Sequence, residues 1–212
     1  NKQNLRIGIN GASGRIGKFL THELSSLDGI EVAALNDPVG AEALVRNYTK
    51  NDSTHGRLPW DIRYESPETI TIDGRRVRVF TEKDASKIDW GGHGVSIVEE
   101  CSGFYTKDGN ARAHLRDGVE RVIVSAPATG DGLVTLIMGV NQEVFDPKKH
   151  DYISNASCTT KALAAPLAIL LDNNVKIYAL LMEMGSASDG RALGLLAPRI
   201  EGEELAIRRA YE

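Results

Sequence analysis

The stretch LRIGINGASGRIG, residues 5–17, decides the fold of this chain. Large apolar residues stand at every second position from Leu5 to Ile9, and the glycines stand at positions 8, 11, 14 and 17. Apolar residues at helical spacing follow. A strand, a glycine-rich turn and a helix in this order form the G-x-x-G-x-x-G version of the dinucleotide-binding fingerprint. We expect Gly11 and Gly14 to admit a pyrophosphate and Gly17 to let the helix pack on the strand. An ordinary glycine-rich turn is the alternative interpretation.

An acidic residue follows the glycines at the distance that this fingerprint requires. The apolar run 30–35 predicts a second strand, and it ends in Asn36-Asp37-Pro38, about 20 residues beyond the glycines. A carboxylate at this place accepts hydrogen bonds from both ribose hydroxyls of an adenosine and repels a 2′-phosphate. Asp37 therefore favours NAD over NADP as the cofactor. An ordinary Asp-Pro turn is the alternative.

The rest of the first 157 residues alternates in the way of an α/β domain. An Asp-Gly pair at 73–74 separates two alternating runs, 69–72 and 76–80, and this pattern predicts an inserted hairpin. Further strands are expected at 95–99, 121–124, 133–140 and 152–153, with a short helix at 110–117. Ser102, Gly103 and Ser125 follow two of these strands, and sites in such folds gather at the carboxyl ends of the strands.

A second motif, SNASCTT at residues 154–160, carries the candidate nucleophile Cys158. A short apolar strand precedes it, and an Ala/Leu-rich run, predicted to be helical to about Asp172, follows it. A helix N-terminus stabilises a thiolate, and the hydroxyls of Ser157 and Thr159 are suited to hold an anion there. A small buried cysteine in a Ser/Thr-rich helix cap is the alternative.

We therefore expect an α/β fold with two parts. Residues 1–157 form a doubly wound, Rossmann-type, mostly parallel sheet with an inserted hairpin. Residues 158–212 form a partial α+β catalytic domain, with the cysteine-bearing helix, a strand at 176–181 and a short helix at 203–212.

Composition restricts the class of protein. The chain has 212 residues, a formal net charge of -4 and 42% hydrophobic residues. No run approaches the ~18 apolar residues of a membrane helix. The start of the chain lacks the charged segment followed by an apolar segment that marks a signal peptide. The mildly acidic net charge gives no reason to expect nucleic acid as a partner. Two cysteines, Cys101 and Cys158, make no disulfide framework. We expect a cytoplasmic protein, with Cys101 a buried packing residue.

The sequence resembles the phosphorylating glyceraldehyde-3-phosphate dehydrogenases and the related erythrose-4-phosphate dehydrogenases. The matching pieces, in the family's order, are IGINGASGRIG, NDP, DSTHGR, EECSGF, HLRDGVERVIVSAPA, IMGVN and SNASCTT. They cover the chain almost continuously from Leu5 to about Met182. SNASCTT is the most specific of them.

The resemblance implies a role for each candidate residue. The cofactor NAD would be held by the turn and strand-end residues, with Arg15 and Ile16 on the pyrophosphate, Asp37 on the adenosine ribose and Lys83 near the adenine. The full set is Asn10, Gly11, Gly14, Arg15, Ile16, Asp37, Lys83, Ser102, Gly103 and Ser125. Cys158 would attack a phosphorylated aldehyde, and Ser157 and Thr159 would hold inorganic phosphate. Family members are usually homotetramers, and no metal is implied.

Three departures from the family pattern stand out. Family members usually have the sequence GFGRIG at this place, so Ala12-Ser13 adds one residue to the turn, which must widen. Lys161 replaces an asparagine after SCTT, and we expect it to point to solvent. Gap-free matching puts Ser186 where the family has its general-base histidine, and no histidine follows His150. Residues 192–202 then resemble a much later family segment. The chain is either a shortened relative or a fragment of a longer protein.

Three functions remain open at this point. The first is NAD-dependent, phosphorylating oxidation of an aldehyde, with glyceraldehyde 3-phosphate and erythrose 4-phosphate not distinguished. The second is a catalytically impaired relative that keeps NAD binding and acts in binding or assembly. The third is another cysteine-dependent aldehyde dehydrogenase, such as one acting on aspartate semialdehyde, which only the G-x-x-G-x-x-G spelling supports.

Overall fold

The computed structural model describes residues 4–52, 56–173, 181–185 and 192–196. The chain divides into two compact units. The first comprises residues up to 136 together with 141–156, and the second comprises residues 137–140 and those from 157 onward. The first unit therefore ends one residue before the predicted boundary at 157, and the small segment 137–140 joins the second unit.

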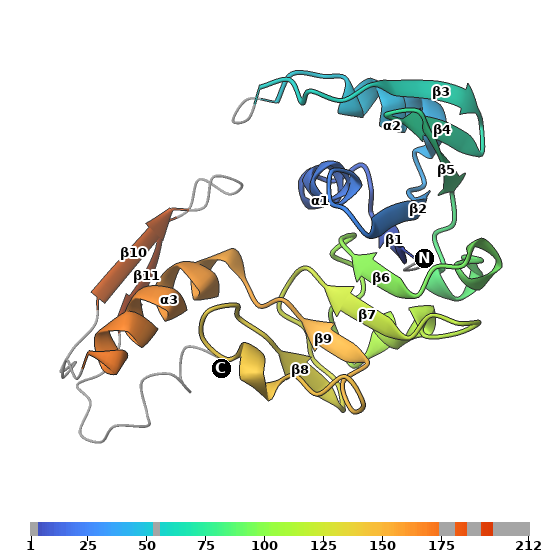
Figure 1. Cartoon of the computed structure of the whole chain (residues 1–212). Coiled ribbons are helices and arrows are strands. Elements are labelled where there is room, and N and C mark those ends of the chain that lie inside the picture. The colour runs from blue at the N-terminus through green and yellow to red at the C-terminus, as the bar shows by residue number, and fades with distance from the viewer. Residues whose placement is uncertain (1–3, 53–55, 174–180, 186–191, 197–212) are drawn as a thin grey trace. The chain divides into compact units, whose positions relative to one another are not determined.

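One nine-stranded sheet forms the frame of the first unit (Figure 1). Its order is β3-β4-β5-β2-β1-β6-β7-β9-β8, with parallel pairing from β5 through to β8 and antiparallel pairing among β3, β4 and β5. The strands are β1 Leu5–Asn10, β2 Ile30–Asn36, β3 Ile62–Ser66, β4 Thr69–Ile72, β5 Arg75–Phe80, β6 Ile97–Glu100, β7 Arg121–Val124, β8 Leu133–Thr135 and β9 Tyr152–Ser154. The predicted Rossmann-type sheet with an inserted hairpin is confirmed.

The described helices are few and short. The α-helices are α1 Arg15–Ser25, α2 Gly40–Tyr48 and α3 Cys158–Asp172, and the 3-10 helices are η1 Ala85–Lys87, η2 Gly91–His93, η3 Asn110–His114 and η4 Gln142–Val144. In the part of the chain that the structure describes, no helix combines the length and apolarity needed to cross a membrane. In the second unit, β10 Leu181–Gly185 pairs antiparallel with β11 Ala192–Leu196.

Two predicted elements differ from the structure. The strand expected at 133–140 ends at Thr135, because the chain after Leu136 turns, with Val140 N–H bonded back to the Ile137 carbonyl. The helix expected at 110–117 is the 3-10 helix η3, and the chain leaves helical geometry at Leu115. Most of the strand predicted at 176–181, and the helix predicted at 203–212, lie outside the described residues.

The strand order places a topological switch point between β1 and β6. From β1 the chain first moves outward to β2, α2 and the hairpin, and then returns to the other side of β1 as β6 (Figure 1). In open α/β sheets, ligands bind outside the carboxyl ends of the strands at such a point. The residues that follow β1, β2, β6 and β7 are therefore the first place to look for a site.

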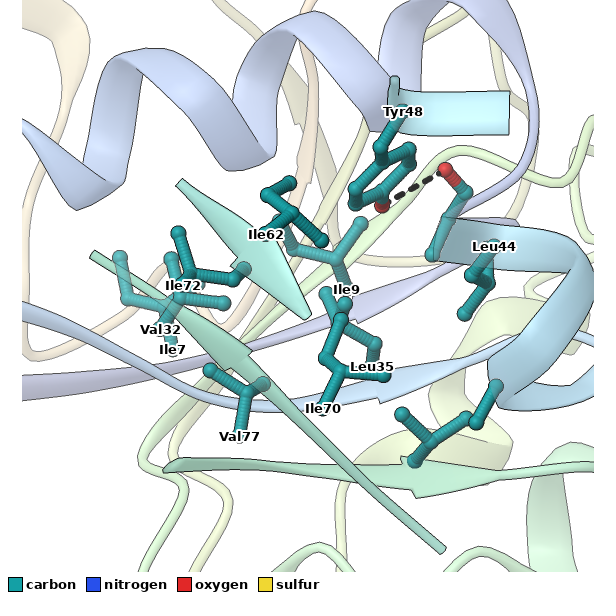
Figure 2. Packing of buried hydrophobic residues seen from close by; sticks show 13 residues of the cluster. Ile7, Ile9, Val32, Leu35, Leu44, Tyr48, Ile62, Ile70, Ile72 and Val77 are labelled. Carbon is teal, nitrogen blue, oxygen red and sulfur yellow. Dashed lines mark hydrogen bonds between the residues drawn. The ribbon is translucent and has the colours of Figure 1, made fainter. Parts of the chain in front are cut away.

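Two apolar clusters cover the two halves of this sheet. One joins β1, β2, α2 and the hairpin, and includes Ile9, Leu35, Leu44, Tyr48 and Ile70, all of them fully buried (Figure 2). The other lies around Trp90 and joins β6, β7 and β9. Both follow from the alternation of apolar residues along the strands, which turns every second side chain to the same face.

A buried polar network ties the strand ends together. The carboxylate of Glu100, at the end of β6, is 1% exposed. Its Oε2 accepts hydrogen bonds from Asn10 Nδ2 at 2.5 Å and His114 Nε2 at 2.9 Å, and its Oε1 accepts the Ser102 backbone N–H at 2.7 Å and the Ser102 hydroxyl at 2.5 Å. Buried charge is tolerated only when it is hydrogen-bonded in this way.

The same network fixes the tautomer of His114, whose side chain is fully buried. Trp90 Nε1, which can only donate, donates to His114 Nδ1 at 3.0 Å. Nδ1 is therefore the acceptor, and Nε2 carries the proton that is donated to Glu100. On the other side, Asn36 Nδ2 donates to Asn10 Oδ1 at 2.6 Å, which extends the network to the end of β2.

We predict that Trp90→Phe lowers the free energy of unfolding by about 1–3 kcal/mol, because His114 Nδ1 is left as a buried acceptor without a donor. Urea denaturation measures the change. Trp60→Phe is the matched control, since Trp60 Nε1 makes a longer bond of 3.3 Å to the Tyr48 carbonyl at a partly buried position. An equal loss in both variants would contradict the importance of the network.

The neighbouring residue Glu99 lies on the opposite face of β6 without such support. The strand register places it between Ile9 of β1 and Ile123 of β7. Burial among these neighbours raises the pKa of its carboxyl from 4.5 to about 7. The folded chain therefore holds this proton at a pH where the unfolded chain has released it.

Stability should consequently fall as pH rises through the window from 4.5 to about 7. We predict that Glu99→Gln has little effect on the free energy of unfolding near pH 4.5. At pH 8, where the wild type must bury a charge, the same change should raise the free energy of unfolding by about 1–3 kcal/mol. Urea denaturation at the two pH values measures this. Glu23→Gln, at a side chain that is 71% exposed, should show no such pH dependence.

Candidate functional site

The glycine-rich turn after β1 lies against the turn after β6 and against the start of α1. Gly11 has φ +79°, and a Cβ on it would lie 2.5 Å from the Ser102 backbone nitrogen. A Cβ on Gly17 would lie 2.3 Å from the Gly11 carbonyl oxygen. Both positions thus require glycine, the first for its backbone angle and for close approach to the turn after β6, the second for close approach of α1 to the loop.

The start of α1 is open to a ligand. Gly14 is its N-cap and supplies no side-chain cap, and the first turn contains no acidic residue. Arg15 and Ile16 are exposed. The first N–H groups of a helix lack intrahelical partners and carry partial positive charge, so this end of α1 suits a pyrophosphate. The bare cap at Gly14 leaves room for the anion, which fits the cofactor predicted for this turn.

Asp37 lies directly after β2 and faces the glycine-rich turn. Its Oδ2 accepts the Ser13 backbone N–H at 2.8 Å, and its Oδ1 accepts the Val39 N–H at 3.2 Å. The residue is 6% exposed. The position at the strand end agrees with the sequence pattern. The sequence analysis did not predict the bond between Asp37 and Ser13.

The turns after β6 and β7 form the other side of this edge. Ser102 is held by Glu100, and Gly103 has φ +77° and is exposed. Ser125 donates its backbone N–H to the Glu100 carbonyl at 3.0 Å. Its hydroxyl is a hydrogen-bond partner of the Cys101 thiol.

Cys101 is not a nucleophile in this setting. Burial, together with the charge of Glu99, raises the pKa of its thiol to about 12. The thiol therefore stays protonated at neutral pH, and a thiolate is the reactive form. This agrees with the prediction that Cys101 packs rather than reacts.

Two predicted cofactor residues take different positions. Asn10 is buried, and its side chain is directed to Glu100 and Asn36, so it supports the site from within. Lys83 lies on the exposed segment after β5, where its carbonyl accepts the Tyr105 hydroxyl at 3.1 Å. The remaining cofactor candidates follow β1, β2, β6 and β7, and the first unit thus brings them to one edge of its sheet.

The second unit carries the cysteine motif at the start of α3. Ser157 is the N-cap, and its Oγ accepts the Thr160 backbone N–H at 2.9 Å. The hydroxyls of Thr159 and Thr160 lie 2.8 and 2.7 Å from the same Oγ. Cys158 is the first residue of the helix and is exposed. The exposed position argues against the alternative of a buried, capped cysteine.

Lys161 lies one helical turn after Cys158. It is half-buried, which differs from the expected solvent-facing position. Burial lowers the pKa of its ammonium group, while the negative charge of a Cys158 thiolate opposes that shift. The two groups are therefore close enough to interact electrostatically.

Sequence reasoning missed the residues that support the site. Glu100 and His114 were not singled out, because each is an ordinary polar residue at the edge of a predicted element. An acidic residue inside a buried strand was the available signal for Glu100, since such a charge requires partners. Asn47 and Tyr48 of α2, which contact the glycine-rich turn, carried no such signal.

The described residues contain no group of three or more His, Cys, Asp or Glu side chains placed to hold a metal ion. The four described histidines, His22, His93, His114 and His150, all belong to the first unit. Ser186, the residue at the family's general-base position, lies outside the described residues.

Residues 5–108 match the family model for the NAD-binding domain of glyceraldehyde 3-phosphate dehydrogenase. Among similar proteins, glyceraldehyde-3-phosphate dehydrogenase 2 of Streptomyces avermitilis is 41% identical over 179 residues, 84% of this chain and 52% of that protein. The glyceraldehyde-3-phosphate dehydrogenase of Chlamydia pneumoniae is 42% identical over 170 residues, 80% of this chain and 50% of that protein. Glyceraldehyde-3-phosphate dehydrogenase 1 of Bacillus subtilis is 39% identical over 173 residues, which are 82% of this chain and 50% of that protein.

The chain thus spans about half the length of the curated relatives that it matches. The region matched by the NAD-binding model contains the glycine-rich turn, Asp37 and the turn after β6. Both kinds of comparison lead to one conclusion: the chain belongs to the glyceraldehyde-3-phosphate dehydrogenase family.

Proposed function

We propose that this chain binds NAD at the strand-end edge of its first unit and uses Cys158 to oxidise glyceraldehyde 3-phosphate with inorganic phosphate. The single observation that carries the proposal is the exposed Cys158 at the first position of a 15-residue helix, with three hydroxyls gathered around its cap. The match to the family's NAD-binding domain supports the choice of cofactor.

In this proposal the bare N-terminus of α1 binds the pyrophosphate through backbone N–H groups. Asp37 accepts hydrogen bonds from the adenosine ribose, since each of its oxygens keeps a lone pair beyond the one used by Ser13 or Val39. Ser102 and Ser125 line the nicotinamide side. Lys83 is proposed to lie near the adenine.

The chemistry assigned to Cys158 is covalent catalysis. Its thiolate attacks the aldehyde carbon, and the carbonyl oxygen takes a proton, which gives a thiohemiacetal on sulfur. NAD, when bound, would supply a hydride acceptor; loss of the hydride from the carbon and of the hydroxyl proton to solvent would convert this adduct to a thioester. Phosphate held by Ser157 and Thr159 then attacks the thioester carbon, the carbon–sulfur bond breaks, and the acyl phosphate leaves with the thiolate restored.

A second candidate function is a catalytically impaired relative that keeps NAD binding and acts in binding or assembly. The observation that favours it is the serine at the position of the family's general base, Ser186. General acid–base help is worth about 10²–10⁴ in rate, so a chain without a substitute base would turn over very slowly. Cytoplasmic location and assembly as a homotetramer are carried over from the resemblance as proposals.

We predict that NAD binds this chain and that Asp37→Asn weakens the binding about tenfold, because a carboxylate that accepts from the ribose is replaced by an amide that presents a donor on one side. The same change should narrow the preference for NAD over NADP, since the charge that repels a 2′-phosphate is removed. Titration calorimetry with both nucleotides measures this. Asp28→Asn, at an exposed position, is the matched control. Unaltered NAD affinity in Asp37→Asn would contradict the assigned role.

We predict that the chain forms NADH from glyceraldehyde 3-phosphate, phosphate and NAD, and that Cys158→Ser reduces the rate to background, because an unactivated hydroxyl does not replace the thiolate. NADH absorbance follows the reaction. Cys101→Ser is the matched control and should keep most of the activity. NAD binding without turnover in the wild type would favour the impaired relative, and a chain that shows neither would exclude both functions.

A further inference from the structure

Ser13, in the glycine-rich turn, is held by a residue of α2. Asn47, near the end of α2, donates from Nδ2 to the Ser13 carbonyl at 2.6 Å. The backbone N–H of the same Ser13 donates to Asp37 Oδ2 at 2.8 Å. The peptide groups on both sides of the Ser13 Cα are therefore fixed, one by α2 and the other by the carboxylate proposed to receive the ribose.

The preceding residue is held from the same helix. Tyr48 is fully buried, and its hydroxyl donates to the Ala12 carbonyl at 2.9 Å (Figure 2). Burial raises the pKa of the phenol far above its ordinary value, so the hydroxyl stays protonated and remains a donor. Ala12 itself is fully buried in the apolar cluster around β1 and β2. The widened turn thus has one position anchored in the core and the next, Ser13, held by Asn47.

The end of α2 is in turn fixed to α1. Lys18 of α1 is 5% exposed, and its Nζ donates to the Asn47 carbonyl at 3.1 Å and the Lys50 carbonyl at 3.4 Å. A cation at this place also complements the negative end of the α2 dipole. Thr21 of α1 lies 3.2 Å from the Tyr48 hydroxyl. The end of α2, which carries Asn47, is therefore held by α1 independently of the glycine-rich turn.

We propose that Asn47 is a positioning residue for dinucleotide selectivity: by holding the turn residue Ser13, it keeps the Ser13 N–H on Asp37 and so fixes the carboxylate that distinguishes NAD from NADP. The proposal rests on the proposed binding of NAD. A turn with one more residue has additional freedom, and fixing it from α2 removes the entropy that binding would otherwise have to overcome. In this proposal Asn47 acts through the Ser13 carbonyl, to which its side chain donates.

The test is the ratio of the NADP and NAD dissociation constants, measured by titration calorimetry. This ratio does not depend on the fraction of folded protein, because both nucleotides bind the same folded form, so a purely structural role for Asn47 would not change it. We expect Asn47→Ala to weaken NAD binding about three- to tenfold, as for loss of one hydrogen bond, and to weaken NADP binding less, so that the ratio falls. Arg46→Ala, at the preceding exposed residue of α2, should leave the ratio unchanged.

Two further variants keep the experiment decisive. Asn47→Asp preserves the shape of the side chain but replaces the donor with an acceptor facing the Ser13 carbonyl, so the ratio should fall at least as far as in Asn47→Ala. Asn47→Ala in an Asp37→Asn background should cause no further fall, because the carboxylate that Asn47 positions is already gone. A ratio equal to that of the wild type in both single variants would overturn the proposal.

The outcomes for the two proposals are distinguishable. If the wild type does not bind NAD, the proposed function fails and the inference about Asn47 fails with it. If the wild type binds NAD and prefers it to NADP, but the Asn47 variants keep the same preference, the proposed function stands and only the positioning role is excluded.

Discussion

The carboxylate of Glu100 is the constraint on which the rest of the first unit depends. It is buried at the end of β6 and satisfied by donors from three separate segments: the end of β1, the turn after β6 and the 3-10 helix η3. Removing any one donor leaves a buried charge partly unpaired, which costs more than the hydrogen bond contributes when formed. The strand ends that build the candidate cofactor site are thus held in place by one group that the cofactor need not touch.

Glu99 and Glu100 show how strand geometry decides the chemistry of adjacent identical residues. Successive side chains of a strand point to opposite faces of the sheet. Glu100 meets a set of donors on its face, whereas the register places Glu99 between Ile9 and Ile123 on the other, where burial raises its pKa to about 7. Sequence alone predicts the alternation but not which face supplies donors, because Asn10 and His114 come from segments distant from β6.

The sequence predicted most of the fold because its signals are local. The glycine spacing, the Asp-Gly turn and the alternating runs each specify one element, whereas the switch point between β1 and β6 is seen only in the strand order of the sheet. The sequence-based prediction was wrong where contacts between distant segments set the end of an element. The chain leaves helical geometry after His114, whose side chain is committed to Glu100 and Trp90, and β8 is shorter than its apolar run. The positions of Cys158 at a helix start and of Asp37 after a strand could be predicted, because the sequence marks where those elements begin and end.

The N-termini of α1 and α3, two of the three described α-helices, are capped in different ways. At α1 the cap is a glycine, so the first N–H groups carry no competing side chain and a ligand can approach the backbone itself. At α3 the cap is Ser157, whose oxygen already accepts the Thr160 N–H and contacts two further hydroxyls. An anion at α3 therefore meets hydroxyl groups that can rotate to donate to it, beside the exposed thiol of Cys158. A fixed backbone cradle suits a cofactor that must bind in one orientation, and an adaptable hydroxyl cluster suits a small anion that must arrive, react and leave with the product.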